Sequence, residues 1–205
     1  MLALSLPASA QNSLDLTVDG VGLSIGDSRE ITGIRLNFRD RAMRSVTGIN
    51  ATIWMPYKDH GGDVRGLALG FAAGGLGVGA GRDVRGVAFG GLGAGAGRDL
   101  KGIVVSGLGA GAGRDIKGIA LGGIAAGGRD VYALSLAPAY FTIEPGGEMR
   151  GLSISAFNRI RGEQKGITIG ILNYARKLSG FQFGLINIAQ NKSRFKIMPF
   201  VNHAR

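Results

Sequence analysis

Apolar residues alternate with other residues along most of this chain, and the alternation restarts at a nearly constant interval. In one copy it runs over Ile103–Val105, slips at Ser106-Gly107 and resumes over Leu108–Ala112. A period of two predicts β-strands, since successive side chains of a strand point to opposite faces. A single straight strand would keep its phase, so the slip predicts two short strands joined at a glycine bend.

Each copy begins with a glycine, an apolar residue, any residue and a second apolar residue. Gly86, Gly102 and Gly118 lie sixteen residues apart, and the other intervals stay near this value. The copies begin at Gly33, Gly48, Gly66, Gly86, Gly102, Gly118, Ala133 (in place of Gly), Gly151, Gly166 and Gly180. A fixed period with one small unit per copy is typical of stacked repeats, in which neighbours bury each other's faces.

The sequence therefore predicts an all-β fold, a flattened repeat β-solenoid of about ten short coils. At the ~4.8 Å spacing of neighbouring strands, the stack would be a rod on the order of 48 Å long. A second corner falls at Gly-Arg-Asp sequences such as Gly97-Arg98-Asp99, where Asp is expected to hydrogen-bond its own backbone. Across the thin interior, we expect the apolar residues of Leu92–Ala96 to face Val87 and Phe89.

An antiparallel β-barrel of the outer-membrane type is the alternative, because one strand and one turn per copy also suit that fold. Two features count against it. Such barrels carry aromatic girdles at both membrane interfaces, whereas this chain has one Trp and four Tyr. The Gly-Arg-Asp corners also repeat with the same chemistry in each central copy, although the two ends of a barrel face unlike compartments.

One β-repeat domain is expected over 11–205, with irregular ends at 13–63 and 191–205. Residues 1–10 resemble the end of a secretory signal, in which an apolar run is followed by Ala8-Ser9-Ala10 before Gln11. We therefore expect an extracytoplasmic location: the periplasm, the outer membrane or the outside of the cell. The chain has no cysteine, so stacking must stabilise the fold without disulfides.

The net charge of +10 favours anionic partners. A basic residue directly precedes the first glycine of most copies, and stacking would align these residues at one edge of the rod. This basic row consists of Arg65, Arg85, Lys101, Lys117, Arg150 and Lys165. A regular row of cations can follow a polyanion, and this is the candidate anion-binding site. The alternative is that these cations only solvate the rim and prevent lateral aggregation.

An anionic polysaccharide, lipopolysaccharide or a membrane surface is the expected partner, with self-association as a further option. Nucleic acid is not favoured, because no aromatic residues interleave the row to stack on bases. Catalysis, metal binding and cofactor binding are not expected. The histidines, His60 and His203, lie in the irregular ends, and the glutamates form no recurring acid and base pair.

Two late copies, Gly166-Ile167-Thr168-Ile169-Gly170-Ile171-Leu172-Asn173 and Gly180-Phe181-Gln182-Phe183-Gly184-Leu185-Ile186-Asn187, resemble a bacterial surface-repeat family. That family, seen in leptospiral surface-repeat lipoproteins, repeats Gly, apolar, Gln, apolar, Gly, Leu, apolar and Asn. The resemblance covers about 149–191 and becomes looser over 65–130, where the Asn is missing, and the lipoprotein cysteine is absent. It implies an exported, envelope-associated protein with no known active-site residues to transfer. We expect a non-enzymatic structural or adhesive surface protein. If the chain instead formed an outer-membrane β-barrel, the expected function would be that of a pore or a membrane anchor.

Overall fold

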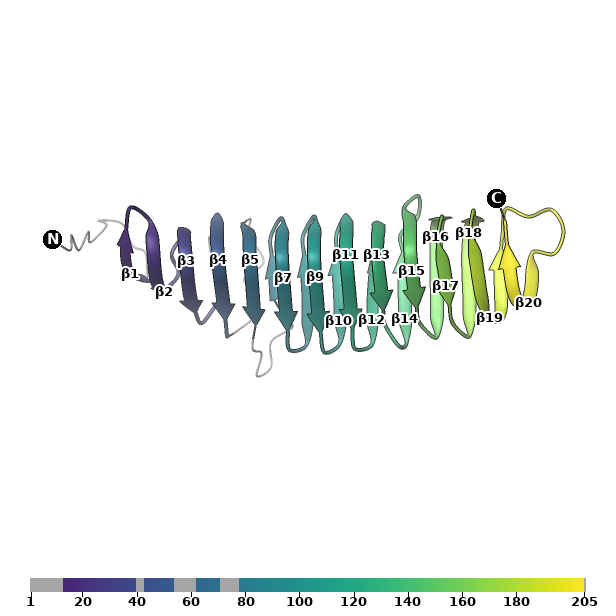
Figure 1. Ribbon diagram of the computed structural model, residues 1–205, viewed down its shortest axis with the longest axis horizontal. Coiled ribbons are helices and arrows are strands. Elements are labelled where there is room, and N and C mark those ends of the chain that lie inside the picture. Colours follow the sequence, from purple (N-terminus) through teal and green to yellow (C-terminus); the bar gives the residue numbers. More distant parts are fainter. Residues whose placement is uncertain (1–12, 40–42, 54–61, 71–77, 205) are drawn as a thin grey trace.

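A computed structural model describes residues 13–39, 43–53, 62–70 and 78–204, and every regular element among them is a β-strand. Together they form an elongated rod (Figure 1). The strands are β1 (Ser13–Val18), β2 (Val21–Gly26), β3 (Glu30–Asn37), β4 (Ser45–Thr52), β5 (Asp63–Gly70), β6 (Val78–Ala80), β7 (Val84–Gly90), β8 (Gly93–Ala96), β9 (Leu100–Ser106), β10 (Gly109–Ala112), β11 (Asp115–Gly122), β12 (Ala125–Gly128), β13 (Asp130–Leu136), β14 (Tyr140–Ile143), β15 (Glu148–Ile154), β16 (Phe157–Gln164), β17 (Ile167–Ile169), β18 (Leu172–Leu178), β19 (Phe181–Ala189) and β20 (Ile197–His203). In this part of the chain, no helix is long and apolar enough to cross a membrane.

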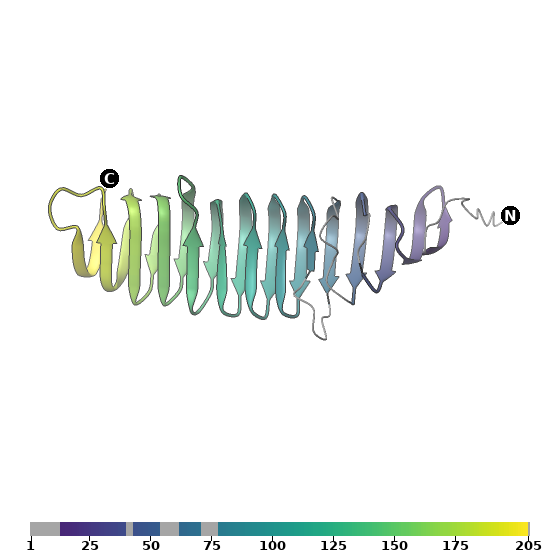
Figure 2. The ribbon, with the colours of Figure 1, turned by 180° about the vertical axis from the view of Figure 1, so that it is seen from behind.

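The strands stack in parallel into two faces that overlie one another when the rod is seen from either side (Figures 1 and 2). The first face, here called the first sheet, runs β2–β3–β4–β5–β7–β9–β11–β13–β15–β17–β19. The second sheet runs β6–β8–β10–β12–β14–β16–β18 and ends on the second half of β19. The β-solenoid prediction is therefore confirmed. The barrel alternative is wrong, because successive copies pair in parallel whereas barrel strands pair antiparallel.

The register between coils follows the repeat of the sequence. Lys101 pairs with Lys117 and Gly102 with Gly118, so equivalent residues of successive copies lie directly beside one another. Each position of the repeat consequently becomes a column of residues that runs along the rod. In the central coils these columns are unbroken. A residue type that recurs at one position of the repeat therefore forms a continuous strip along the surface.

The interior differs from the prediction in which apolar residues point inward. The first sheet buries one column that begins with Ile31, Val46 and Val64 and continues through Val84 and Leu100, and a second column that includes Ala88. Phe89, which was expected in the core, is 46% exposed, and the prediction for Val87 and Phe89 is wrong. Because strand residues alternate, Arg85, Val87 and Phe89 all face outward while Val84 and Ala88 face inward. The prediction for the second sheet was right for Ala94 and Ala96, which are buried.

Glycines at the start of the copies let the coils of the first sheet approach closely. Gly118 has a φ of +128°, and a Cβ atom there would overlap the carbonyl oxygen of Gly102 in the neighbouring coil. An L-residue rarely adopts that conformation, so glycine is required for two independent reasons. Ala133 occupies the equivalent place in its coil, and its φ is not positive. The glycine column therefore continues through most of the sheet but is interrupted at β13.

Buried amides stabilise the coils nearest the C-terminus. Asn158 donates to Asn173 Oδ1 and Asn173 donates to Asn187 Oδ1, each over 2.8 Å. All three side chains are fully buried. A similar hydrogen bond between coils runs from Gln182 Nε2 to Gln164 Oε1 over 3.1 Å. Such hydrogen bonds satisfy the polar atoms of successive coils, which a buried amide requires.

Both ends of the stack carry strands of reversed direction. β1 pairs antiparallel with β2, and β20 pairs antiparallel with β19. A strand at each end covers an edge of the stack that would otherwise be available for pairing with another chain. The first sheet already begins at β2, within the region 13–63, whereas the second sheet begins at β6. The signal prediction for residues 1–10 lies outside the described residues, as does His60, and the domain division stays a prediction.

Candidate anion-binding surfaces

The structure brings all six residues of the predicted basic row together on the outer face of the first sheet. Arg65 pairs with Arg85, Arg85 with Lys101 and Lys101 with Lys117, so they occupy one column. Lys117 pairs with Tyr132, and Tyr132 with Arg150. The Lys165 N–H donates to the Met149 carbonyl over 2.7 Å, which places Lys165 in the next coil of the same column.

Tyr132, which is not part of the predicted site, interrupts the basic row. The Lys117 ammonium lies 5.4 Å from the ring centroid of Tyr132, and the Arg150 guanidinium carbon lies 5.6 Å from it. Both distances fall within the range of cation–π attraction. The expectation that no aromatic residue interleaves the row is therefore wrong at this coil, because Tyr132 stands where the two neighbouring coils have Lys117 and Arg150.

Carboxylates flank the basic row two residues earlier in each strand and partly neutralise it. Lys117 lies 3.3 Å from Asp115, and Lys165 lies 3.4 Å from Glu163 and 2.8 Å from Glu148 of the preceding coil. Arg150 also contacts Glu148. The hydrogen bond from Lys165 is the main reason that the pKa of Glu148 lies below its usual value, although burial acts in the opposite direction. Glu148 therefore stays ionised at neutral pH, and the neighbouring carboxylates give the row a weaker field than its cations alone would produce.

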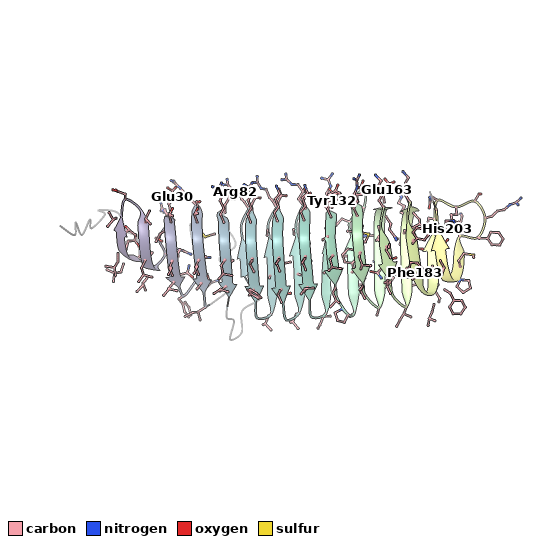
Figure 3. The ribbon with its side chains drawn as sticks, viewed as in Figure 1. Glu30, Arg82, Tyr132, Glu163, Phe183 and His203 are labelled. Carbon is pink, nitrogen blue, oxygen red and sulfur yellow. The ribbon has the colours of Figure 1, made fainter. Side chains whose placement is uncertain are left out.

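The corner arginines neutralise the same carboxylates from the other side. Arg114 donates through Nε and Nη2 to both oxygens of Asp99 in the preceding coil, over 2.7 and 2.6 Å. The same two-pronged contact joins Arg98 to Asp83 and Arg82 to Asp63. The expectation that these aspartates hydrogen-bond within their own turn is replaced by a bridge between coils. Figure 3 shows Arg82, Tyr132 and Glu163 along the same long edge of the rod.

Two apolar columns continue the outer face of the first sheet beyond the basic row. In β7, β9 and the following strands, the residues one and three positions after the glycine point outward, and many are between 36 and 48% exposed. They include Ile34, Leu36, Phe89, Ile103, Leu134, Leu136, Ile154, Ile167, Ile169, Phe181 and Phe183. Two adjacent columns along ten strands make a patch on the order of 500 Å², comparable to the largest apolar patch of an ordinary monomer.

A second cationic surface, which is not predicted from the sequence, lies on the second sheet. Arg159, Arg161 and Arg176 line a groove of about 620 Å³ together with Phe157 and Tyr174. Among the described residues, none of these three guanidinium groups forms an ion pair with a carboxylate, in contrast to the basic row. The sequence contains a signal for this surface, since Asn158-Arg159-Ile160-Arg161 and Asn173-Tyr174-Ala175-Arg176 occur at equivalent places in successive copies. The Asn of each segment is buried, so the first and third residues after it point outward.

A second groove of about 760 Å³ adjoins the first at Arg161 and has a floor of small residues. Gly95, Gly111 and Gly127 form one column of this floor, which continues into Thr142 and Arg159. Glycines leave the backbone uncovered in the central coils, and the larger side chains begin at β14. The grooves together therefore form an open channel along the second sheet that ends in a cationic and aromatic wall.

No family model, curated protein or solved structure matches this chain. The structure confirms the repeat β-solenoid fold. The resemblance to the surface-repeat family stays a prediction. Within the described residues, no group of three or more His, Cys, Asp or Glu side chains is arranged to hold a metal ion.

Proposed function

We propose that this protein is a non-enzymatic solenoid of the bacterial cell envelope that lies along an anionic lipid surface through the outer face of its first sheet. The proposal is supported by one observation: the basic row and the two apolar columns share that face and run in parallel along the rod. Its extracytoplasmic location rests on the signal-like sequence at 1–10.

The charge pattern favours a lipid surface over a neutral partner. Lysines and arginines near an anionic headgroup layer each contribute about 1 kcal/mol, and exposed apolar side chains beside them reach the boundary of the acyl chains. Each central coil contributes one cation and two apolar side chains, as in Arg85, Val87 and Phe89. The contribution of one coil is small, but the coils are rigidly joined, so their contacts act together.

The carboxylates beside the row weaken this attraction without reversing it. Asp99 lies between Arg114 and Lys101, 2.6 Å from the first and 3.9 Å from the second, so two cations meet one anion at this coil. Asp83 lies in the same way between Arg98 and Arg85. The edge therefore keeps a net positive charge, in agreement with the charge of +10 for the whole chain.

The test is co-sedimentation of the chain with vesicles of phosphatidylglycerol and phosphatidylcholine, compared with vesicles of phosphatidylcholine alone. We expect binding to the anionic vesicles that decreases with salt, as for any screened attraction between exposed charges. The double variant Lys101→Gln with Lys117→Gln should weaken vesicle binding by up to about 30-fold, because two cations of about 1 kcal/mol each leave the row. Phe89→Ser, which changes only the apolar column, should weaken it several-fold.

The matched control is the double variant Arg159→Gln with Arg176→Gln, which removes the same charge from the second sheet. It should leave vesicle binding unchanged. An equal loss in both double variants would show that only net charge matters, and equal binding to neutral vesicles would show that the cations play no part. Either result contradicts the proposal, as does a chain that forms dimers through the apolar columns and binds neither vesicle.

A further inference from the structure

We propose that the groove of the second sheet binds a carboxylated polysaccharide, with Arg159, Arg161 and Arg176 as the residues that hold its carboxylates. This site is independent of the lipid-binding surface, since it lies on the other sheet and uses none of the residues of the basic row. It differs from that row in a property that matters for binding: the described residues supply no carboxylate partner to its guanidinium groups.

The three arginines come from neighbouring strands and face the same groove. Arg159 pairs with Tyr174 across β16 and β18, and Arg161 and Arg176 directly follow the paired residues Ile160 and Ala175. Arg159 and Arg176 are exposed, whereas Arg161 is half-buried. The Nε atom of Arg161 is fully buried and has no hydrogen-bond partner. A planar guanidinium with free donors binds a carboxylate through two parallel hydrogen bonds, which is the geometry that such sites use.

Aromatic rings stand beside the arginines. Phe157 and Tyr174 line the same groove as the arginines, and Tyr140, which lines the adjoining groove, packs against Phe157 with ring centroids 5.5 Å apart. Burial raises the pKa of the Tyr140 hydroxyl, but contacts with Thr142 and Arg159 and the charge of Arg161 outweigh it, so the pKa lies below its usual value. The electrostatic potential is therefore positive around the Tyr140 hydroxyl, next to Arg159 and Arg161. Rings of this kind provide apolar surface for the carbon face of a sugar, while the arginines take its charge.

The composition of the groove favours a sugar acid over nucleic acid. Tyr140 and Phe157 are tilted by 58° to each other, so they do not form a row of parallel faces on which successive bases could stack, whereas a single ring is enough to contact one sugar. Glu144 lines the adjoining groove with Arg161. A carboxylate accepts hydrogen bonds from sugar hydroxyls, which single-stranded DNA does not offer along its chain. A polymer of hydroxylated rings with a carboxylate on each ring supplies hydroxyl donors for Glu144 and carboxylates for the arginines.

The shape of the site indicates a polymer and not a single sugar. The wall of arginines and aromatic rings opens onto the glycine floor of Gly95, Gly111 and Gly127, and the two grooves measure about 620 and 760 Å³. The floor is uncovered because side chains are absent there, so a chain bound at the wall can extend over it along the rod. A bound polysaccharide would therefore lie parallel to the rod axis.

The experiment uses the full chain and oligosaccharides of alginate, a polymer of uronic acids, in isothermal titration calorimetry. Neutral dextran oligosaccharides and single-stranded oligo(dT) serve as comparison ligands. We expect binding of alginate, none of dextran, and a loss of about 10- to 100-fold in affinity for alginate in the double variant Arg159→Gln with Arg176→Gln. The matched control, Lys101→Gln with Lys117→Gln, should bind alginate as the unchanged chain does.

Arg176→Lys supplies a second measurement, because it keeps the charge but loses the planar fork and should bind more weakly than the unchanged chain. Circular dichroism of each variant confirms the fold before titration. Saturation-transfer NMR on the unchanged chain adds a readout without mutation: sugar protons should receive magnetisation from the tyrosine and phenylalanine rings. Equal weakening by both double variants, tighter binding of oligo(dT) than of alginate, or binding of dextran would each overturn the proposal.

Discussion

Replacing Gly118 with alanine should destabilise the solenoid strongly, because two costs coincide at this residue. Its φ of +128° lies where L-residues are strained, and the new Cβ atom would overlap the carbonyl oxygen of Gly102. The backbone strain costs about 1–3 kcal/mol. Relief of the overlap requires the two coils to move apart, which weakens the hydrogen bonds between β9 and β11. We expect a total loss of about 3–5 kcal/mol, near the upper end for single substitutions.

Thermal unfolding followed by circular dichroism measures this effect. For a chain of this size, 1 kcal/mol corresponds to about 2–4 °C in Tm, so Gly118→Ala should lower Tm by roughly 6–20 °C. The matched control is Gly109→Ala in β10, where the nearest atom to a new Cβ would be the Ala125 carbonyl oxygen at 4.0 Å. That variant should change Tm by no more than a few degrees. Equal effects of the two substitutions would refute the reasoning from the glycine column.

Two further predictions concern the polar contacts between coils. Asn173→Ala removes the acceptor for Asn158 and the donor to the Phe183 carbonyl, and it should cost about 2–4 kcal/mol in urea unfolding, because buried polar groups lose their partners. An unchanged urea midpoint would contradict this. The hydrogen bond from Arg114 is the main reason that the pKa of Asp99 is lowered in the folded chain. Ionised Asp99 therefore contributes its full stabilisation above the pKa of the unfolded chain, and this stabilisation is lost as the pH falls through the pKa of the folded chain. Asp99→Asn should therefore reduce stability near pH 7 and leave a smaller loss of stability on acidification than the unchanged chain shows.

The repeat made the fold predictable from the sequence. Fixed spacing between glycines determines the register of the stack, and the structure pairs Gly86 with Gly102 and Gly102 with Gly118 as that spacing requires. The alignment of the basic row followed from the same register. No property of a single residue was needed for these predictions, since a period shared by many copies outweighs irregularities in any one of them.

The direction of the apolar side chains was predicted wrongly, although the sequence contained the information. Arg85 was placed outside, and a period of two then requires Val87 and Phe89 to be outside as well. The prediction assumed that apolar residues form the core. At β7 the core takes Val84 with the small side chain of Ala88, and the larger Phe89 remains on the surface. The pairing of Asp99 with Arg114 was also missed, because contacts between coils depend on side-chain reach across the stack.

The direction of the hydrogen bonds determines how the rod responds to force. Bonds between coils point along its axis, and the first and last strands lie at opposite ends (Figure 1). Tension applied at the two ends would therefore detach one coil at a time, instead of breaking all coils together. Each central coil contains sixteen residues, as the pairing of Lys101 with Lys117 shows, and can extend by roughly 50 Å once detached. Pulling on single molecules should therefore give a sawtooth with one step per coil, and the steps should be most regular over the central coils, where the register repeats every sixteen residues.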